Sequence, residues 1–239
     1  MATMTGPEAR EFWKALMDNA SCLVADARLL LEAGSFGRAR SLTILAQEEL
    51  GKALWIHDEF EAAWSCGLQD ARTVERLREH GRRHIQKYLD AATFGRELAA
   101  FWGDFSNFEP PSGETPMEAA TRLRAEDESR QAKAEKSARE ANIDKQNGFY
   151  VDRDEQGHVL SPSEIGAGAV EAEMQRAAQV IEMLLIKDHT RMKDEALTAY
   201  DSTHAQQFRL LPISHPEDWA AASEEFHRGP AAQESRADD

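Results

Sequence analysis

Apolar residues recur at three-, four- and seven-residue steps along most of the chain, which is typical of amphipathic helices. The pattern predicts helices over residues 7–32, 36–65, 71–102 and 117–147, another over 162–200, and a short one over 216–226. The expected core-facing residues of the first, second and fifth helices are Phe12, Leu16, Leu23, Ala27 and Leu30; Leu42, Ala46, Ala53, Ile56 and Phe60; and Val170, Met174, Ala177, Ile181 and Leu184. The chain is therefore predicted to be all-α.

Glycine and proline mark the expected ends of these helices. Gly34 follows the first helix, and glycine tolerates the positive φ that is common at the end of a helix. Residues 109–116 (EPPSGETP) interrupt the helical pattern with three prolines and a glycine. Residues 148–160 contain two short apolar runs around a turn-like Asp-Glu-Gln-Gly, which predicts a small β-hairpin-like insertion. The next helix is expected to start at Ser161-Pro162, and residues 229–239 read as a disordered tail.

Composition narrows the class of protein. The chain has 239 residues, a formal net charge of −15 and two cysteines, so a disulfide scaffold is excluded. No apolar run is long enough to span a bilayer and no secretion signal is recognisable, so we expect a cytoplasmic protein that makes no contact with membranes. The acidic balance argues against a general nucleic-acid coat but leaves room for one local basic stripe, residues 72–87.

Two neighbouring glutamates in the second helix invite different interpretations. Glu48 stands four residues before Lys52, the better orientation for an ion pair on a helix surface. Glu49 lies seven residues after Leu42 and seven before Ile56, inside the apolar stripe. A carboxylate there needs a partner or must become neutral, so Glu49 is either functional or part of a buried ion pair.

The basic stripe carries the residue types that cleave phosphodiesters. Arg76, His80, His84 and Lys87 are spaced three or four apart and would line one face of the third helix, where a solvated polar face is the simpler interpretation. A neutral histidine can accept the 2′-hydroxyl proton of RNA, and an arginine can hold the phosphate. His80 and His84 alone are a weak metal signal, and no nucleotide or cofactor motif is present, so neither metal nor cofactor is expected.

Three motifs resemble the AbiV family of abortive-infection proteins, phage-defence members of the HEPN superfamily. The first is the alanine-rich SLTILAQEELGKA at Ser41–Ala53, after a helix that ends at Gly34. The second is His84-Ile-Gln-Lys87 on the following helix. The third is Gly148-Phe-Tyr-Val-Asp152, followed by Ser161-Pro162. The likeness extends over about residues 15–200.

The resemblance implies a HEPN-like antiparallel helical bundle over residues 1–204, with residues 205–239 as a C-terminal extension. Many HEPN proteins are metal-independent RNases that dimerise and use an arginine and a histidine with four to six residues between them. Arg78 and His84 have that spacing, about 120° apart on an ideal helix, although Arg82 or Arg83 could replace Arg78. The supporting or RNA-binding residues would be Glu48, Glu49, Lys52, His80, Arg83, Lys87, Tyr150 and Asp152.

The resemblance leaves more than one function open. The first is an endoribonuclease that cleaves RNA to 2′,3′-cyclic phosphate ends and arrests growth, acting as a homodimer with a phage-encoded protein as activator. The alternative is a non-catalytic protein that senses a phage protein and blocks translation. A third, a nucleotide-binding or nucleotidyl-transferred HEPN partner of the antitoxin type, would use a tyrosine near the arginine–histidine pair, such as Tyr88.

Overall fold

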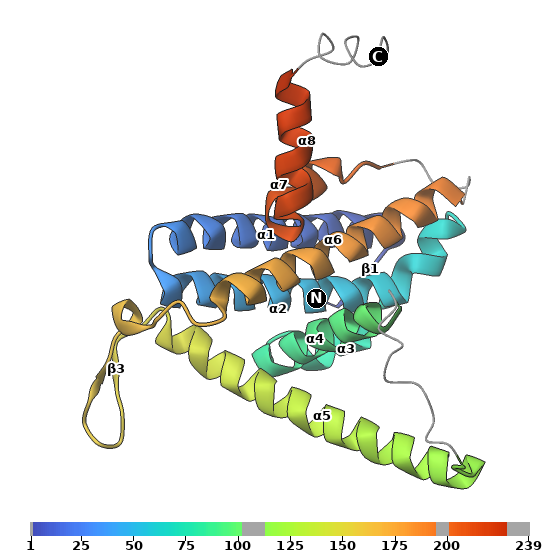
Figure 1. The fold of residues 1–239 in the computed structure, drawn as a ribbon. Coiled ribbons are helices and arrows are strands. Elements are labelled where there is room, and N and C mark those ends of the chain that lie inside the picture. Colours follow the sequence, from blue (N-terminus) through green and yellow to red (C-terminus); the bar gives the residue numbers. More distant parts are fainter. Residues whose placement is uncertain (1, 102–112, 195–200, 229–239) are drawn as a thin grey trace.

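The computed structural model describes residues 2–101, 113–194 and 201–228, and most of these residues are helical (Figure 1). The all-α prediction is confirmed. The predicted tail at 229–239, the end of the third helix at Trp102 and part of the predicted break at 109–116 lie outside the described residues. The elements, in chain order, are β1 (Thr3–Met4), α1 (Gly6–Glu32), α2 (Phe36–Ser65), β2 (Arg72–Thr73), α3 (Glu75–His80), α4 (His84–Phe101), α5 (Pro116–Asn147), β3 (Asp152–Arg153), β4 (Val159–Leu160), a 3-10 turn (Pro162–Glu164), α6 (Val170–Asp194), α7 (His204–Ser214) and α8 (Pro216–Arg228).

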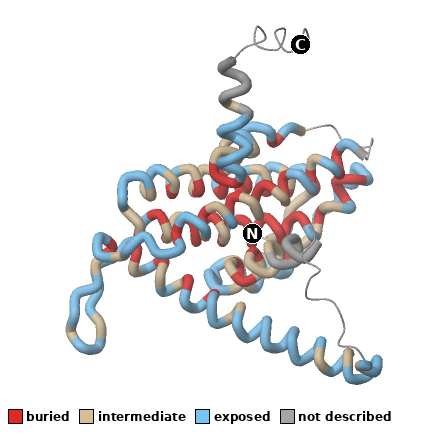
Figure 2. The backbone as a smooth tube through the Cα atoms, viewed as in Figure 1, coloured by how far each residue is buried: buried red, intermediate tan, exposed pale blue. Residues whose placement is uncertain are grey.

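Helix α2 lies at the centre of the bundle. It contacts α1, α4, α5 and α6, and α7 packs on the side formed by α1 and α6 (Figure 1). Gly34, at φ 72°, links α1 to α2 as predicted. Two short antiparallel strand pairs complete the fold: β1 with β2, and β3 with β4, which form the predicted hairpin. Because helices cover α2 on several sides, buried residues occur around most of its circumference (Figure 2).

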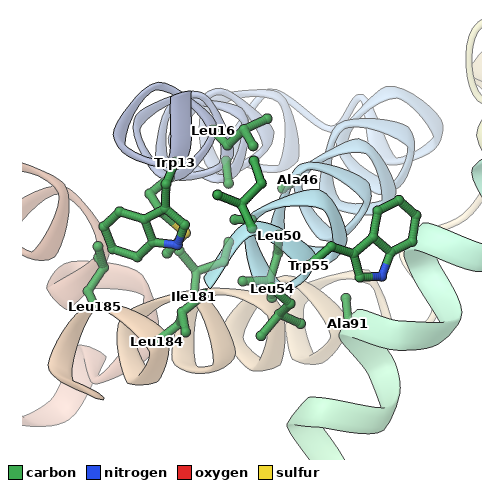
Figure 3. Close-up of a cluster of buried hydrophobic side chains, with 14 of the residues drawn as sticks. Trp13, Leu16, Ala46, Leu50, Leu54, Trp55, Ala91, Ile181, Leu184 and Leu185 are labelled. Carbon is green, nitrogen blue, oxygen red and sulfur yellow. The ribbon is translucent and has the colours of Figure 1, made fainter. Parts of the chain in front are cut away.

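The hydrophobic core forms where α1, α2 and α6 meet. Trp13 and Leu16 of α1 face Leu50 of α2 and Ile181 and Leu184 of α6 (Figure 3). The predicted stripe of α6 is confirmed, since all five of its residues are buried. The predicted stripe of α1 is partly wrong. Phe12 is 37% exposed, because the face centred on Trp13 turns inward instead.

The second half of the chain departs from the prediction in two places. The predicted start at Ser161-Pro162 is only a 3-10 turn, and α6 begins at Val170, after Gly168 adopts a positive φ of 45° that interrupts the helix. Helix α7 was not predicted, and Pro212 lies inside it. Its residues Leu210 and Ile213 are buried in the main core. Within the described residues, no helix is long and apolar enough to cross a membrane.

Helix α5 is anchored at one end only. Its first half projects beyond the bundle as an almost fully exposed helix (Figures 1 and 2). Ion pairs along its surface support it, including Arg122 with Glu126 and Lys136 with Glu140. Only its last turns carry buried residues: Ala138, Ala141 and Lys145. The structure therefore confirms the predicted exposed, charge-paired helix and adds a narrow buried stripe.

Gly51 permits the contact between α2 and α4. A Cβ built on Gly51 would lie 2.1 Å from the carbonyl oxygen of Lys87. We expect Gly51→Ala to destabilise the protein by about 1–3 kcal/mol, because the backbone of α4 must move away. Chemical denaturation measures this change. Gly166→Ala is the matched control, since a Cβ at Gly166 would enter open space, and equal stability of the two variants would contradict the expectation.

A buried histidine lies inside the aromatic part of the core. His57 is fully buried between Trp13 and Trp64, with ring centroids 6.1 Å away in both cases. The Glu61 carboxylate is 3.6 Å from His57 Nδ1, too far for a good hydrogen bond. Burial, followed by the positive charges of Lys187, Arg191 and Arg10, lowers the pKa of His57 to about 3. The folded protein therefore holds this histidine neutral.

This low pKa predicts a stability that falls in acid. Between pH 6.5 and about pH 3, His57 is protonated in the unfolded chain but neutral in the folded protein. The free energy of unfolding therefore decreases as pH falls through this window. His57 alone should lower the free energy of unfolding by about 2–3 kcal/mol between pH 7 and pH 4.5. Denaturation at both pH values should show a smaller loss for His57→Phe than for the wild type. His158→Gln, at an exposed histidine, is the control. An unchanged pH dependence in His57→Phe would contradict the assignment.

Candidate functional site

The buried carboxylate of Glu48 joins three helices of the bundle. Its side chain on α2 is 3% exposed and meets His84 Nδ1 at 2.6 Å, Lys87 Nζ at 3.3 Å and Lys145 Nζ at 2.5 Å. His84 and Lys87 lie on the first turn of α4, and Lys145 lies near the end of α5. We call these four residues the Glu48 network. Apart from His84, its members are buried.

Close backbone approaches bring the three helices to this point. Gly51, one turn after Glu48, allows the carbonyl of Lys87 to approach α2. On the other side, Gly148 lies so close to α2 that a Cβ there would be 2.0 Å from the hydroxyl oxygen of Ser41. That hydroxyl lies within hydrogen-bond distance of the carbonyl oxygens of Lys145, at 2.9 Å, and Gly37, at 3.0 Å. The site is thus built on helix packing and not on a loop.

The Glu48 network holds its carboxylate ionised. Burial raises the pKa of Glu48 and is the largest single influence. Hydrogen bonds from His84 and Lys145, with the charges of Lys145 and Lys87, together outweigh burial, so the pKa lies below its ordinary value. One negative and two positive charges therefore meet here, and the network carries a positive excess at neutral pH.

His84 is the member of the network that solvent reaches. Its side chain is 54% exposed. An ionised Glu48 can only accept a hydrogen bond, so Nδ1 of His84 carries the hydrogen and, in the neutral ring, Nε2 keeps its lone pair. The carboxylate also stabilises the imidazolium that forms when Nε2 takes a proton. The pair has the arrangement of an oriented general base with its reactive nitrogen opposite the buried partner.

The predicted continuous helix over 71–102 is wrong. The chain forms β2 and α3, turns at residues 81–83, and restarts as α4 at His84. Gly81, the poorest helix former after proline, occupies the break. Arg78 and His84 are consequently on different helices, and the angle expected from a single helix does not apply to them. Arg76, His80, His84 and Lys87 do not form one helical face for the same reason.

The basic residues of the predicted stripe, residues 72–87, differ in their ion-pair partners in the structure. Arg78 is 61% exposed and pairs with Glu75 at 2.6 Å and with Glu79 at 3.9 Å. Arg76 pairs with Asp90 of α4 at 3.4 Å, and His80 Nε2 lies 3.8 Å from Glu79. Arg82 and Arg83 are exposed in the turn immediately before His84. They form no ion pair within the described part of the chain, so they are the arginines nearest in sequence to His84 that an anion could engage.

The structure reverses the two interpretations of the glutamates. Glu48, expected to form a surface pair with Lys52, is instead the buried centre of the network. Glu49, expected inside the apolar stripe, is 18% exposed and pairs with Lys52 at 2.6 Å. The spacing from Leu42 to Ile56 describes one face of α2. However, α4 and α5 bury the neighbouring face, and Glu48 lies there.

Tyr150 and Asp152 lie at the base of the hairpin that extends from the end of α5 (Figure 1). Tyr150 is 69% exposed, and Asp152 Oδ1 accepts a hydrogen bond from the backbone N–H of Arg153. Among the described residues, no hydrogen bond or ion pair joins either side chain to the Glu48 network. No group of three His, Cys, Asp or Glu that could hold a metal ion is found there either.

The sequence reading missed Lys145. This residue is separated from Glu48 by 97 positions, and most of its helix is exposed. A usable signal was present, because Ala138, Ala141 and Lys145 recur at three and four residues, the spacing of a narrow buried stripe. A lysine on such a stripe requires an anionic partner. Nothing in the sequence identified Glu48 as that partner.

Comparison with known proteins identifies the family of this chain. No curated protein and no solved structure matches this chain. The family model described as AbiV matches residues 8–182, which include all four members of the Glu48 network and end within α6. The chain therefore belongs to the AbiV family of abortive-infection proteins, in the HEPN superfamily.

Proposed function

We propose that this protein is a phage-defence effector that arrests growth by cleaving RNA at His84. The observation that carries the proposal is the geometry of His84, whose Nδ1 is bound to the buried Glu48 carboxylate while its ring remains half exposed. An imidazole fixed in this way is suited to general acid–base chemistry in solvent. The surplus positive charge of the network and the exposed Arg82 and Arg83 favour a polyanionic substrate.

In the proposed reaction the RNA supplies its own nucleophile. Nε2 of His84 takes the proton of a 2′-hydroxyl, whose oxygen attacks the adjacent phosphorus. The bond from phosphorus to the 5′-oxygen breaks, and this oxygen takes a proton from water while the imidazolium of His84 returns its own proton to solvent, giving a 2′,3′-cyclic phosphate and a 5′-hydroxyl. An arginine, Arg78, Arg82 or Arg83, stabilises the charge on the phosphoryl oxygens. Lys87 and Lys145 are buried on Glu48, so we assign them to holding the carboxylate and not to binding RNA.

Three further parts of the proposal concern the working form of the protein. Arg78 lies on a different helix from His84, so a second copy of the chain could supply the arginine. A homodimer is therefore proposed as the active form. A phage-encoded protein is proposed as the activator, and the cytoplasm as the place of action.

A cleavage assay tests the proposal. Purified protein is incubated in EDTA with an end-labelled RNA and with the same strand carrying 2′-deoxy residues. The RNA should be cut to cyclic-phosphate ends and the deoxy strand should remain intact, because the step uses the 2′-hydroxyl and only protein groups. Equal cutting of both strands, or cyclic-phosphate ends that disappear with EDTA, would contradict the mechanism.

The alternative is a protein that blocks translation without cutting RNA. The ion pairs of Arg78 with Glu75 and Glu79 favour it, because they occupy the arginine that the family pattern selects. The formal net charge of −15 also suits a protein partner better than bare RNA. Sequencing of total RNA after induction discriminates the two functions. Growth arrest with intact cellular RNA supports the alternative, whereas new cyclic-phosphate ends support the nuclease.

A further inference from the structure

The hairpin that follows α5 exposes large apolar side chains. Tyr150, Val151 and Val159 are 69%, 68% and 58% exposed, and Phe149 and Leu160 are 37% and 38% exposed. We call these five residues the hairpin patch. The hairpin projects from the bundle, and within the described residues β3 and β4 pair only with each other (Figure 1). Neighbouring exposed apolar side chains of this kind are typical of a surface that binds another molecule.

A cavity of about 350 Å³ lies where the hairpin joins the bundle. Its lining comes from α2, the end of α5, β4 and the residues that follow β4: Arg40, Asp144, Asn147, Leu160, Ser161, Glu164 and Ile165. Leu160 belongs to both the hairpin patch and this lining, so the cavity is continuous with the apolar surface. None of the lining residues belongs to the Glu48 network.

The lining of this cavity carries an excess of negative charge. Its single cation, Arg40, is shared by two carboxylates, Asp144 at 3.1 Å and Glu173 at 3.1 Å. Glu164 is exposed and forms no ion pair within the described part of the chain. The protein therefore leaves a carboxylate at the cavity without a cation of its own.

The hairpin has the same sign of charge. Residues 148–165 contain four carboxylates and one arginine, which gives a formal net charge of −3 with histidine neutral. Such a surface repels RNA and anionic lipids. A second copy of the chain docked on the same surface would bring like charges together, which opposes association. The charge instead complements a basic partner.

From these observations we propose that the hairpin patch and the cavity together bind a segment of a partner protein in which a lysine or an arginine stands next to large apolar side chains. The cation of the segment pairs with Glu164 in the cavity. Its apolar side chains cover Tyr150, Val151 and Leu160 and remove them from water. Because the surface is separate from the Glu48 network, the proposal does not depend on the proposed cleavage of RNA.

Binding of synthetic peptides to the full chain tests the proposal. The probe is a fluorescein-labelled peptide in which valine and leucine alternate with arginine. The comparison peptide has glutamate in place of every arginine. Fluorescence anisotropy should show that the basic peptide binds and that the acidic peptide binds about tenfold more weakly or worse. Added salt should weaken binding of the basic peptide.

Two substitutions separate the charge from the apolar surface. Glu164→Lys reverses the unpaired charge of the cavity, and Leu160→Ser removes the apolar side chain that the cavity and the hairpin patch share. Both residues are exposed, so both variants should fold, which circular dichroism checks. Each variant should weaken binding of the basic peptide about tenfold.

The projecting half of α5 supplies a matched control for each variant. Glu128→Lys makes the same change of net charge at another exposed glutamate. Leu123→Ser removes a leucine that is 39% exposed, close to the exposure of Leu160. Both controls should bind the basic peptide as the wild type does.

The proposal is overturned if the basic peptide does not bind the wild type, or if the acidic peptide binds equally well. It is also overturned if folded Glu164→Lys and Leu160→Ser proteins bind the basic peptide as the wild type does. Equal weakening by Glu128→Lys and Glu164→Lys would overturn it too, because the attraction would then come from the overall charge of −15 and not from this surface.

Discussion

Replacing His84 with alanine is expected to lower the rate of RNA cleavage by about 10²–10⁴-fold, the usual contribution of a general acid–base group. The loss should come from the chemical step, because alanine removes the one ring nitrogen that the Glu48 network presents to solvent. Stability should change little, by about 1 kcal/mol, since Glu48 keeps both of its lysines. Single-turnover cleavage of a labelled RNA and thermal denaturation of the same samples measure the two effects.

The chain supplies a close control for this variant. His158 is also exposed and also bound through Nδ1 to a carboxylate, Asp154, at 2.9 Å. It follows Arg153 by five residues and so has the arginine–histidine spacing as well, but it lies in the hairpin and not on the bundle. His158→Ala should cleave at the wild-type rate. Equal cleavage by His84→Ala and the wild type would show that His84 is not the catalytic base.

Replacing Glu48 with alanine is expected to destabilise the protein by about 3–5 kcal/mol. The substitution leaves Lys87 and Lys145 buried without an anion, and removing one partner of a buried ion pair has a cost of this size. In a chain of this length the melting temperature should fall by about 10 °C. Denaturant unfolding and calorimetry measure the loss. Because the pKa of Glu48 is lowered from 4.5, its contribution is present above that pH and disappears as pH falls further, as the carboxylate protonates.

Two further variants separate stability from activity. Glu49→Ala removes the partial surface pair with Lys52 and should cost less than about 1 kcal/mol. A triple variant, Glu48→Met with Lys87→Met and Lys145→Met, replaces the buried charges by apolar side chains. It should recover much of the stability lost in Glu48→Ala. It should nevertheless cleave RNA slowly, because His84 loses its orienting carboxylate. A triple variant with full activity would show that Glu48 is only structural.

Most of the helices were predictable, because amphipathic spacing and turn residues are local properties of the chain. The bounds of α1 and α2 agree with the prediction to within one residue, and Gly34 ends α1 with positive φ. The family motif around Glu48 and the His84-Ile-Gln-Lys87 motif were also visible in the sequence. The break at Gly81 could have been predicted from its low helix propensity, but the flanking periodicity favoured one long helix.

Burial around α2 is where local reasoning failed. Amphipathic analysis assumes one buried face, which suited α6 but not a helix enclosed by α1, α4, α5 and α6. Under that assumption Glu48 was assigned to the surface and Glu49 to the core, and the structure shows the reverse. In α1, Phe12 was assigned to the core but is 37% exposed, and the neighbouring Trp13 is buried.

The sequence by itself therefore determined the all-α class, most helix positions, the family and the residue types available for chemistry. Only the tertiary structure decided which of them meet. Lys145 reaches Glu48 across 97 positions, and Gly51 and Gly148 let α4 and α5 approach α2 closely enough for that contact. These pairings depend on how helices pack at long range, and the hydrophobic periodicity of a single helix contains no information about which neighbour will cover each of its faces.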